Sequence, residues 1–376
     1  MFSGEIPHQL TATGSRLVYL NLSNNRLRGE MLPRDSNMTD LECLQISGNN
    51  FRGVISPAIS RSPSLVILDI RNNYLSGNIP SWLYNHPHLV AVLLGGNNFE
   101  GHIRRQLCRM KTLQVLDISK NHLRGGIPSC LDNITFWKQS PPDDTNYFTQ
   151  NGRLYFLLNP SGKPTLDFEI GTDFLTKNVL YSFKGLPLTL MTGINLSWNK
   201  LTGYIPSELG ELSQLRSLNL SNNLLTGNIP TSFQNLKSME SLDLSRNNLS
   251  GDIPYPMAKL SSLSSFSVAY NNLSGRIPSD GQFSTFDMNS FIGNPLFCGD
   301  PLPQICSTTN PLEPQDKDQE KEDSIFQSNL FFYGFVAVSY AFGLWVSFGI
   351  LILNRRWRQT YFRAIDRYIL SFFGQK

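Results

Sequence analysis

One sequence frame recurs through most of the chain with a fixed period. The clearest copies are LRSLNLSNNLLTGNIP, MESLDLSRNNLSGDIP and LSSFSVAYNNLSGRIP, which share the frame L-x-x-L-x-L-x-x-N-x-L-x-G-x-I-P. Their asparagines, Asn223, Asn247 and Asn271, stand 24 residues apart. The same frame returns upstream at Asn25, Asn49, Asn73, Asn97, Asn121 and Asn199. A chain with this periodicity is constrained to fold as a stack of similar coils.

The chemistry of each repeat explains the stacking. Two leucines flank one residue, as Leu218 and Leu220 do, so both point inward from a short strand while the residue between them faces outward. One coil cannot bury its own apolar face, and neighbouring coils therefore share a continuous core. The repeated asparagine satisfies backbone groups where the coil turns away from the strand. We predict an α/β leucine-rich-repeat solenoid, a right-handed superhelix with a parallel sheet on its concave face.

The register breaks once, between Asn121 and Asn199, which are 78 residues apart instead of 24. The extra residues combine turn formers with alternating aromatic and aliphatic positions, so we expect a small folded island that interrupts the solenoid. The predicted order is repeats over 1–132 (a partial coil plus five), island 133–190, four repeats over 191–278, C-terminal cap 279–309, acidic juxtamembrane linker 310–329, transmembrane helix 330–353 and basic cytoplasmic tail 354–376.

Residues 330–353 contain no charged side chain. At 1.5 Å per residue a helix of this length spans about 36 Å, which exceeds the roughly 30 Å hydrocarbon core of a bilayer. Arg355, Arg356 and Arg358 follow directly, so the positive-inside rule predicts a plasma-membrane protein with a cytoplasmic C-terminus and extracellular repeats. Small residues recur every fourth position of the span, which favours pairing with another helix, although such residues are common in membrane helices. They are Ser339, Gly343 and Ser347.

The cysteines and asparagines fit an extracellular chain. Cys108 and Cys130 lie nearly one coil apart, within disulfide reach, and Cys298 and Cys306 form a second plausible pair. Cys43 falls on an outward strand position and is predicted to be a free thiol. Seven N-x-S/T sequences predict glycosylation. Their asparagines are Asn21, Asn37, Asn133, Asn195, Asn219, Asn248 and Asn272.

Several classes of function are disfavoured. The formal net charge of +3 is carried by the C-terminal tail, so no nucleic-acid partner is predicted. The sequence has no phosphate-binding glycine loop, nucleophile elbow or kinase signature, and a 23-residue tail is too short for a kinase domain. The pair His86 and His88 is a weak metal signal. We expect no enzyme, metal or cofactor.

The outward strand positions are the remaining candidate for function. Downstream of the island they are small and polar, whereas upstream they vary and include apolar side chains that require a covering partner. We predict a site for an extracellular peptide or protein on the concave face; the alternatives are scattered surface hydrophobes, or cover by glycans or by the island. The candidate residues are Tyr19, Ile67, Asp69, Arg71, Leu93, Asp117, Lys120 and Trp198.

The LSGxIP repeats, the island, the cap sequence GQFSTFDMNSFIGNPLFCGDPLPQIC, the single span and the short basic tail together resemble plant leucine-rich-repeat receptor-like proteins. The resemblance implies a cell-surface receptor without a kinase, which perceives a defence or developmental signal and associates with adaptor and co-receptor kinases. It also implies that Cys108 and Cys130 form the late disulfide and that 177–185 is the island motif, with Phe183 where tyrosine is usual.

Two other hypotheses remain open. One is a non-signalling repeat protein, such as a decoy or an inhibitor of pathogen polysaccharide-degrading enzymes. The other is a truncated receptor kinase. Because Met1 is followed by FSGEIP, the end of a repeat, we expect a fragment or a truncated gene product.

Overall fold

The computed structural model describes residues 1–12, 16–138, 171–177, 179–184 and 190–306 of the chain. Contacts divide the chain into two units, Met1–Ser307 and Thr308–Lys376. The predicted linker, span and tail, with the helix-pairing residues Ser339, Gly343 and Ser347, lie outside the described residues. Within the described ranges, no helix is long and apolar enough to cross a bilayer.

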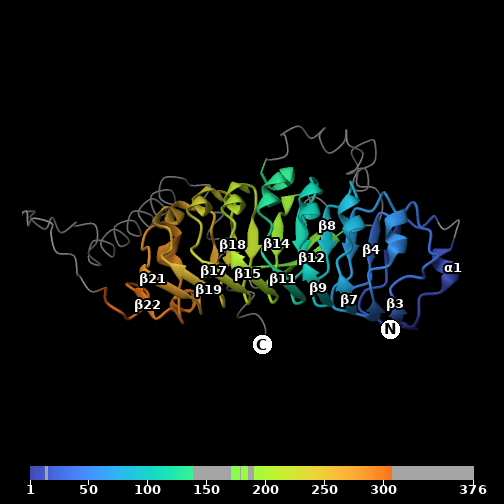
Figure 1. Cartoon of the computed structure of the whole chain (residues 1–376), viewed down its shortest axis with the longest axis horizontal. Coiled ribbons are helices and arrows are strands. Elements are labelled where there is room, and N and C mark those ends of the chain that lie inside the picture. Colours follow the sequence, from blue (N-terminus) through green and yellow to red (C-terminus); the bar gives the residue numbers. More distant parts are fainter. Residues whose placement is uncertain (13–15, 139–170, 178, 185–189, 307–376) are drawn as a thin grey trace, which may run out of the picture. The chain divides into compact units, whose positions relative to one another are not determined.

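The described repeats form a solenoid with a parallel sheet of nine strands along one side (Figure 1). Each strand is the outward-inward-outward segment of one repeat, and five strands precede the island and four follow it. In sheet order they are β2 (Tyr19–Asn21), β4 (Cys43–Gln45), β6 (Ile67–Asp69), β8 (Ala91–Leu93), β10 (Val115–Asp117), β14 (Gly193–Asn195), β16 (Ser217–Asn219), β18 (Ser241–Asp243) and β20 (Ser265–Ser267).

A second sheet, of eleven strands, was not predicted from the sequence. It is built from the segment that follows each repeated asparagine, where a buried leucine alternates with exposed residues, as Leu225 does between Leu224 and Thr226. Its strands are β1 (Ser3–Gly4), β3 (Arg26–Glu30), β5 (Asn50–Gly53), β7 (Tyr74–Asn78), β9 (Asn98–His102), β11 (His122–Gly125), β15 (Lys200–Tyr204), β17 (Leu224–Gly227), β19 (Asn248–Gly251), β21 (Asn272–Arg276) and β22 (Leu296–Cys298).

Short 3-10 helices return the chain from the second sheet to the first. Five of the described ones, η2, η4, η7, η8 and η9, begin directly after the proline of the I-P pair, whose fixed φ suits the residue before the first helical position. They are η1 (Pro57–Arg61), η2 (Ser81–Asn85), η3 (Arg105–Arg109), η4 (Ser129–Asn133), η5 (Thr135–Trp137), η7 (Ser207–Glu211), η8 (Thr231–Asn235), η9 (Tyr255–Lys259), η10 (Gly281–Thr285) and η11 (Met288–Ser290), with one short α-helix, α1 (His8–Thr11).

The repeated asparagines form a continuous ladder inside the solenoid. Asn97 is typical: its side-chain amide donates to the carbonyl oxygens of Ile70 (3.0 Å) and Leu94 (3.0 Å), and its Oδ1 accepts from the Leu75 N–H (3.0 Å). The contacts link each coil to its neighbour and leave few backbone groups unpaired in the turn. The ladder continues into the cap, where Asn294 accepts from the Leu273 N–H at 3.0 Å.

The island does not disturb this ladder. Strand β10 pairs directly with β14 across the insertion. Asn199 accepts from the Leu123 N–H (3.0 Å) and donates to the Ile118 carbonyl (3.0 Å), which lie 76 and 81 residues earlier in the chain. The two halves of the solenoid are therefore stacked as ordinary neighbours.

The C-terminal end of the core is closed by aromatic side chains. Phe283 and Phe291 are 2% and 0% exposed, and the Phe283 ring lies 4.8 Å from that of Phe266 in the last repeat strand. Phe286 stacks on Phe266 at 5.6 Å. These contacts cover the core of the last coil, as the cap sequence predicts.

Both predicted disulfides are present. Cys108 and Cys130, on consecutive coils, have Cα atoms 5.8 Å apart, and Cys298 and Cys306 in the cap have Cα atoms 5.0 Å apart. Cys43 is a free thiol, as predicted, but it is only 1% exposed.

Candidate functional site

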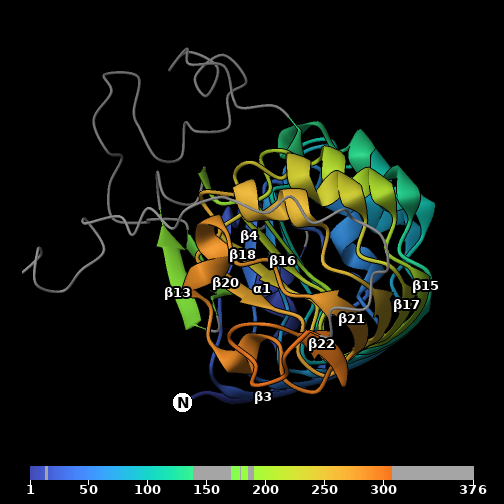
Figure 2. The ribbon, with the colours of Figure 1, turned by 90° about the vertical axis from the view of Figure 1, so that its left-hand side faces the viewer.

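The described part of the island is a β-hairpin placed over the nine-stranded sheet. Its strands β12 (Gly171–Thr176) and β13 (Val179–Lys184) are antiparallel, with Phe174 opposite Tyr181. Figure 2 shows β13 on the side of the solenoid opposite β15 and β17. The hairpin therefore covers strand positions that face outward from the repeats.

Phe174 anchors the hairpin in an apolar well. Its side chain is 0% exposed and belongs to a small cluster separate from the main core. The well is formed by outward-facing residues of consecutive strands and by one residue before β14. These are Cys43, Ile67, Ala91, Leu93, Val115 and Met191. Burying one phenylalanine in this way stabilises the docked hairpin by roughly 1.5–3 kcal/mol.

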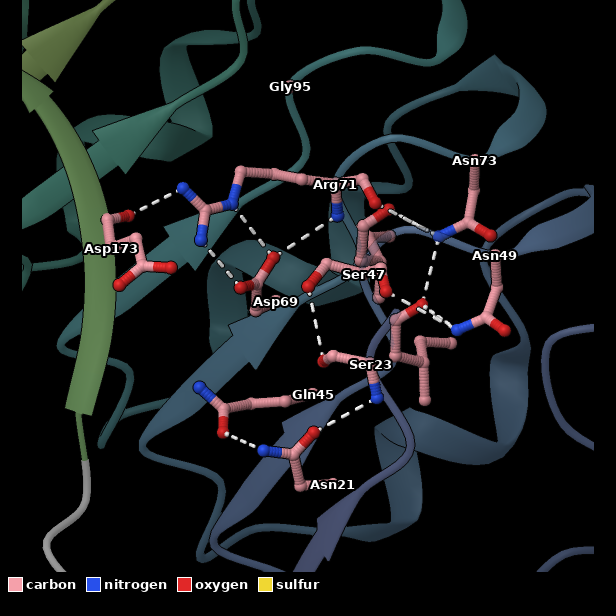
Figure 3. A network of polar contacts seen from close by, with 12 residues as sticks. Asn21, Ser23, Gln45, Ser47, Asn49, Asp69, Arg71, Asn73, Gly95 and Asp173 are labelled. Carbon is pink, nitrogen blue, oxygen red and sulfur yellow. Dashed lines mark hydrogen bonds and ion pairs between the residues drawn. The ribbon is translucent and has the colours of Figure 1, made fainter. Parts of the chain in front are cut away.

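Arg71 fastens one end of the hairpin (Figure 3). Its Nε and Nη2 atoms donate to the two carboxylate oxygens of Asp69 at 2.9 and 2.6 Å, and its Nη1 atom donates to the Asp173 carbonyl oxygen. The Arg71 and Asp69 side chains are 11% and 4% exposed. Such a two-point pair is stronger than a neutral hydrogen bond and fixes the guanidinium toward the hairpin backbone.

Lys177 fastens the other end. Its backbone N–H donates to Ser241 Oγ at 3.1 Å, and its Nζ lies 2.8 Å from Glu240 Oε2. Glu240 also pairs with Arg216 through its other oxygen. Burial alone would raise the pKa of Glu240, but the two cations outweigh it and hold this pKa below its usual value. This ion-pair group ties the hairpin to the repeats that follow the island.

Asp117 lies next to the Arg71 pair. Burial raises the pKa of its carboxyl group, and the charge of Arg71 and hydrogen bonds from Ser119 oppose that rise. Asp117 Oδ1 accepts from the Ser119 N–H at 3.0 Å and from Ser119 Oγ at 2.6 Å. The negative charge of Asp117 thus favours the charged form of Arg71, and the Asp117 side chain is buried within the sheet.

The hairpin leaves two features accessible. A surface pocket of about 450 Å³ lies where Tyr181 and Phe183 face Arg216 and Glu240. On the hairpin itself, apolar side chains remain largely open: Val179 is 49%, Leu180 60% and Tyr181 44% exposed. An apolar ridge beside a charged pocket is the kind of surface that protein partners bind.

The predicted ligand residues divide into three groups in the structure. Ile67 and Leu93 are 0% exposed because Phe174 covers them, which corrects the expectation that they are open to an external ligand. Asp69, Asp117 and Arg71 are buried or nearly so, in the network beneath the hairpin. The covering partner that the apolar positions require is the island itself.

The remaining predicted residues lie at the margin of the nine-stranded sheet. Tyr19 is half-buried and donates to Gln45 Oε1 at 2.8 Å. Lys120 is exposed, and Trp198 is 57% exposed; both follow their strands in the left-handed region, with φ of 49° and 54°. They occupy equivalent positions on adjacent coils, where the Asn121 N–H donates to the Trp198 carbonyl at 3.1 Å.

Phe174, Lys177 and Glu240 were missed by sequence reasoning. Alternation in the island indicated a folded element, but the strands that Phe174 covers extend from Cys43 to Val115, far earlier in the chain, and no local pattern identifies them. The serine-rich strands after the island gave no sign that Glu240, just before β18, would hold the hairpin.

One glycosylation prediction is wrong. Asn195 is 1% exposed, and its Oδ1 accepts from the Ser197 N–H at 3.2 Å and from Ser197 Oγ at 2.7 Å, so the folded repeat has no space for a glycan there. The other six acceptors are at least partly exposed. They are Asn21, Asn37, Asn133, Asn219, Asn248 and Asn272.

The described side chains do not suggest a metal centre. Across the described ranges, no group of three or more histidine, cysteine, aspartate or glutamate side chains is placed to hold a metal ion. The polar groups at the hairpin pair with one another or with backbone atoms, which is an arrangement for holding surfaces together.

Comparison with protein families identifies the repeats. Models described as leucine rich repeat match residues 213–273 and, as single repeats, 16–38, 40–62, 64–86, 112–134 and 191–212. Cuscuta receptor 1 of Solanum lycopersicum is 50% identical over 260 residues, covering 63% of this chain and 23% of that protein. Receptor-like protein 56 of Arabidopsis thaliana is 50% identical over 263 residues, covering 64% and 27%.

Solved structures show the same architecture. The ectodomain of the Arabidopsis thaliana receptor kinase GASSHO1/SCHENGEN3, in complex with CASPARIAN STRIP INTEGRITY FACTOR 2, matches with a TM-score of 0.58 and 27% identity over 81% of this chain and 33% of that one. The Arabidopsis receptor kinase HAESA, with the peptide hormone IDA and the co-receptor SERK1, matches with a TM-score of 0.57 and 28% identity over 80% and 45%.

These findings define the class first: the chain is a leucine-rich-repeat protein with the architecture of plant receptor ectodomains. Within that class it belongs to the plant leucine-rich-repeat receptor-like proteins. The chain spans about a quarter of the length of the curated relatives named above.

Proposed function

We propose that this chain is part of a kinase-less cell-surface receptor that binds an extracellular peptide or protein and signals through associated receptor kinases, in plant defence or development. The observation that carries the proposal is the hairpin of β12 and β13, which Phe174, Arg71 and Lys177 hold against the nine-stranded sheet. It converts the nine-stranded sheet from an open surface into a composite one, with Leu180 and Tyr181 exposed beside the Glu240 pocket.

The chemistry of this surface fits recognition without catalysis. Exposed aliphatic and aromatic side chains supply contact area, and Arg216, Glu240 and Lys177 supply fixed charges around the pocket. Phe174 and a polar contact at each end, Arg71 with Asp173 and Lys177 with Glu240, hold the hairpin in place. Little conformational freedom therefore remains to be lost when a ligand binds.

The similar ectodomains support a peptide or protein ligand. GASSHO1/SCHENGEN3 was solved with CASPARIAN STRIP INTEGRITY FACTOR 2, and HAESA with the peptide hormone IDA and the co-receptor SERK1. We infer the same general mode here, with the ligand surface moved from the covered positions Ile67 and Leu93 to the outer face of the hairpin and its pocket. Lys120 and Trp198 belong to the proposed surface as exposed groups at its margin.

We also propose that the protein is a single-pass plasma-membrane protein. The uncharged segment 330–353 and the arginines after it support an orientation with the repeats outside and the tail in the cytoplasm. Ser339, Gly343 and Ser347 would then face a partner helix of an adaptor or co-receptor kinase. Protease treatment of intact cells should digest a tag placed before Met1 and spare a tag placed after Lys376.

The recognition surface is tested by selecting peptides from a displayed library on the full chain in lipid nanodiscs. Enriched peptides should lose at least tenfold in affinity for Leu180→Asp, because the charge disrupts an apolar contact. Leu224→Asp is the matched control, since Leu224 is similarly exposed (50% against 60%) but lies on β17 of the other sheet. Peptides that bind both variants as tightly as the unmodified chain would refute the hairpin site.

A further inference from the structure

A second surface feature lies on the 3-10 helical side of the solenoid, at the fourth full repeat. Helix η3 (Arg105–Arg109) and the two residues before it line a cavity of about 460 Å³. Three of the five lining residues are arginines, Arg104, Arg105 and Arg109, and all three are exposed. The other two are Ile103 and Gln106.

The repeat frame does not account for these arginines. Arg104 stands where the adjacent repeats have Pro80 and Pro128. At the position of Arg105 the adjacent repeats have serine, and at that of Arg109 they have asparagine. One coil therefore concentrates three positive charges between two coils that are uncharged at the same positions.

The three guanidinium groups have no partner within the described chain. None forms an ion pair or a side-chain hydrogen bond with another described residue. Arg104 lies close enough to Tyr84 for its charge to oppose the rise that burial causes in the pKa of that phenol. Mutual repulsion of three neighbouring cations is unfavourable, and an anion in the cavity would relieve it.

Arg61, another arginine of the solenoid, has a structural role and serves as a comparison. Arg61 occupies the position in η1 that Arg109 occupies in η3. Its guanidinium donates to the carbonyl oxygens of Arg34 at 2.8 Å and Ser36 at 2.7 Å, so it ties two coils together. Arg109 makes no such contact with the described residues and is available to a ligand.

We propose that the cavity at η3 binds a compact ligand carrying two or more phosphate or sulfate groups. Guanidinium groups present paired N–H donors whose spacing matches two oxygens of one such group, and several together select a multiply charged ligand. The cavity volume of about 460 Å³ is sufficient for a compact ligand with two such groups. The site lies on the helical side, separate from the hairpin, and the proposal does not depend on the function of that surface.

The test is calorimetric titration of the full chain in nanodiscs with pyrophosphate and, separately, with a sulfated disaccharide, each against potassium chloride of equal ionic strength. Binding of pyrophosphate alone would identify a phosphate ligand, and binding of the disaccharide alone a sulfate ligand. If neither binds above the salt control, the proposal is overturned.

Variants locate the binding. The double change Arg104→Gln and Arg109→Gln should weaken it by at least about tenfold, since two charge-assisted contacts are lost. Lys259→Gln is the matched control because Lys259 is exposed and holds the position of Arg109 in η9. An unchanged melting temperature verifies folding. Equal affinity of the double variant and the unmodified chain would overturn the assignment.

Discussion

The Phe174 ring fills the space that a Cβ atom on Gly193 would need. Such an atom would lie 2.5 Å from Phe174 Cε1 and 2.6 Å from Cζ. Gly193 opens β14, the first strand after the island, so the absence of its side chain is what lets the hairpin anchor reach the sheet. A glycine in the repeat frame thus has a specific partner in the inserted segment.

Gly193→Ala should therefore loosen the hairpin while leaving the repeats folded. The added methyl group displaces the buried Phe174 ring, and hydrogen exchange at the amides of β12 and β13 should become faster. The matched control is Gly126→Ala, where the nearest neighbour of an added Cβ is Thr202 O at 3.8 Å. Unaltered exchange in the Gly193 variant would show that the ring is not held as described.

Cys43 offers a chemical measure of hairpin docking. Burial, with smaller contributions from Asp69 and Glu42, raises the pKa of its thiol, and Phe174 packs in the same cluster. A thiol reagent should find no reactive cysteine in the folded chain and one after unfolding, with both disulfides intact.

Phe174→Ala should raise the rate at which Cys43 reacts, because the hairpin loses the roughly 1.5–3 kcal/mol that burial of the ring contributes to its docking. Leu180→Asp, on the outer face of the same hairpin, should leave Cys43 protected. A slow, unchanged rate in Phe174→Ala would mean that something else covers the thiol.

The ladder predicts a sharp difference between two adjacent asparagines. Asn97→Ala removes the partners of one N–H group and two carbonyl oxygens in the interior, at about 1–3 kcal/mol for each unsatisfied group. We expect a loss of roughly 3–5 kcal/mol in the free energy of unfolding, measured by chemical denaturation. Asn98→Ala, an exposed position on β9, should change it by less than about 0.5 kcal/mol. Equal effects would contradict the ladder.

Acid should release the end of the hairpin held by Glu240. The folded-state pKa of Glu240 is lowered, so its contribution is present above the unfolded-state pKa and is lost as pH falls through the folded-state pKa. Exchange at the Lys177 amide, corrected for its intrinsic pH dependence, should accelerate in that range. Glu240→Gln should remove the transition and Glu211→Gln, an exposed control on η7, should not. Burial raises the pKa of Glu42 to about 7, so any transition caused by Glu42 would occur at a higher pH than that of Glu240.

The period of the sequence predicted much of the solenoid. The spacing of the asparagines gave the coil boundaries, the register across the island and the inward leucines, because each of these depends on local chain geometry that repeats. The disulfide between Cys108 and Cys130 followed from the same geometry. Strands of the second sheet escaped notice because the L-x-G segment is too short to show alternation of its own.

The site was less predictable for a physical reason. The strand pattern shows that Ile67 and Leu93 face outward, but facing outward is not the same as being exposed. Their cover comes from Phe174, far along the chain, and only the tertiary structure brings these residues together. Asn195 illustrates the same limit, since an acceptor sequence within a repeat strand is buried by the fold that the repeat produces.

The direct hydrogen bonds of Asn199 to Leu123 and Ile118 have a consequence for how the insert can vary among related chains. The coils before and after the insert form hydrogen bonds directly with each other. The stacking of these two coils therefore does not depend on the segment between them. Lengthening or exchanging it adds only a slowly growing entropy of loop closure. A protein of this family can therefore acquire a different insert at this point while the hydrogen bonds between the two flanking coils are kept.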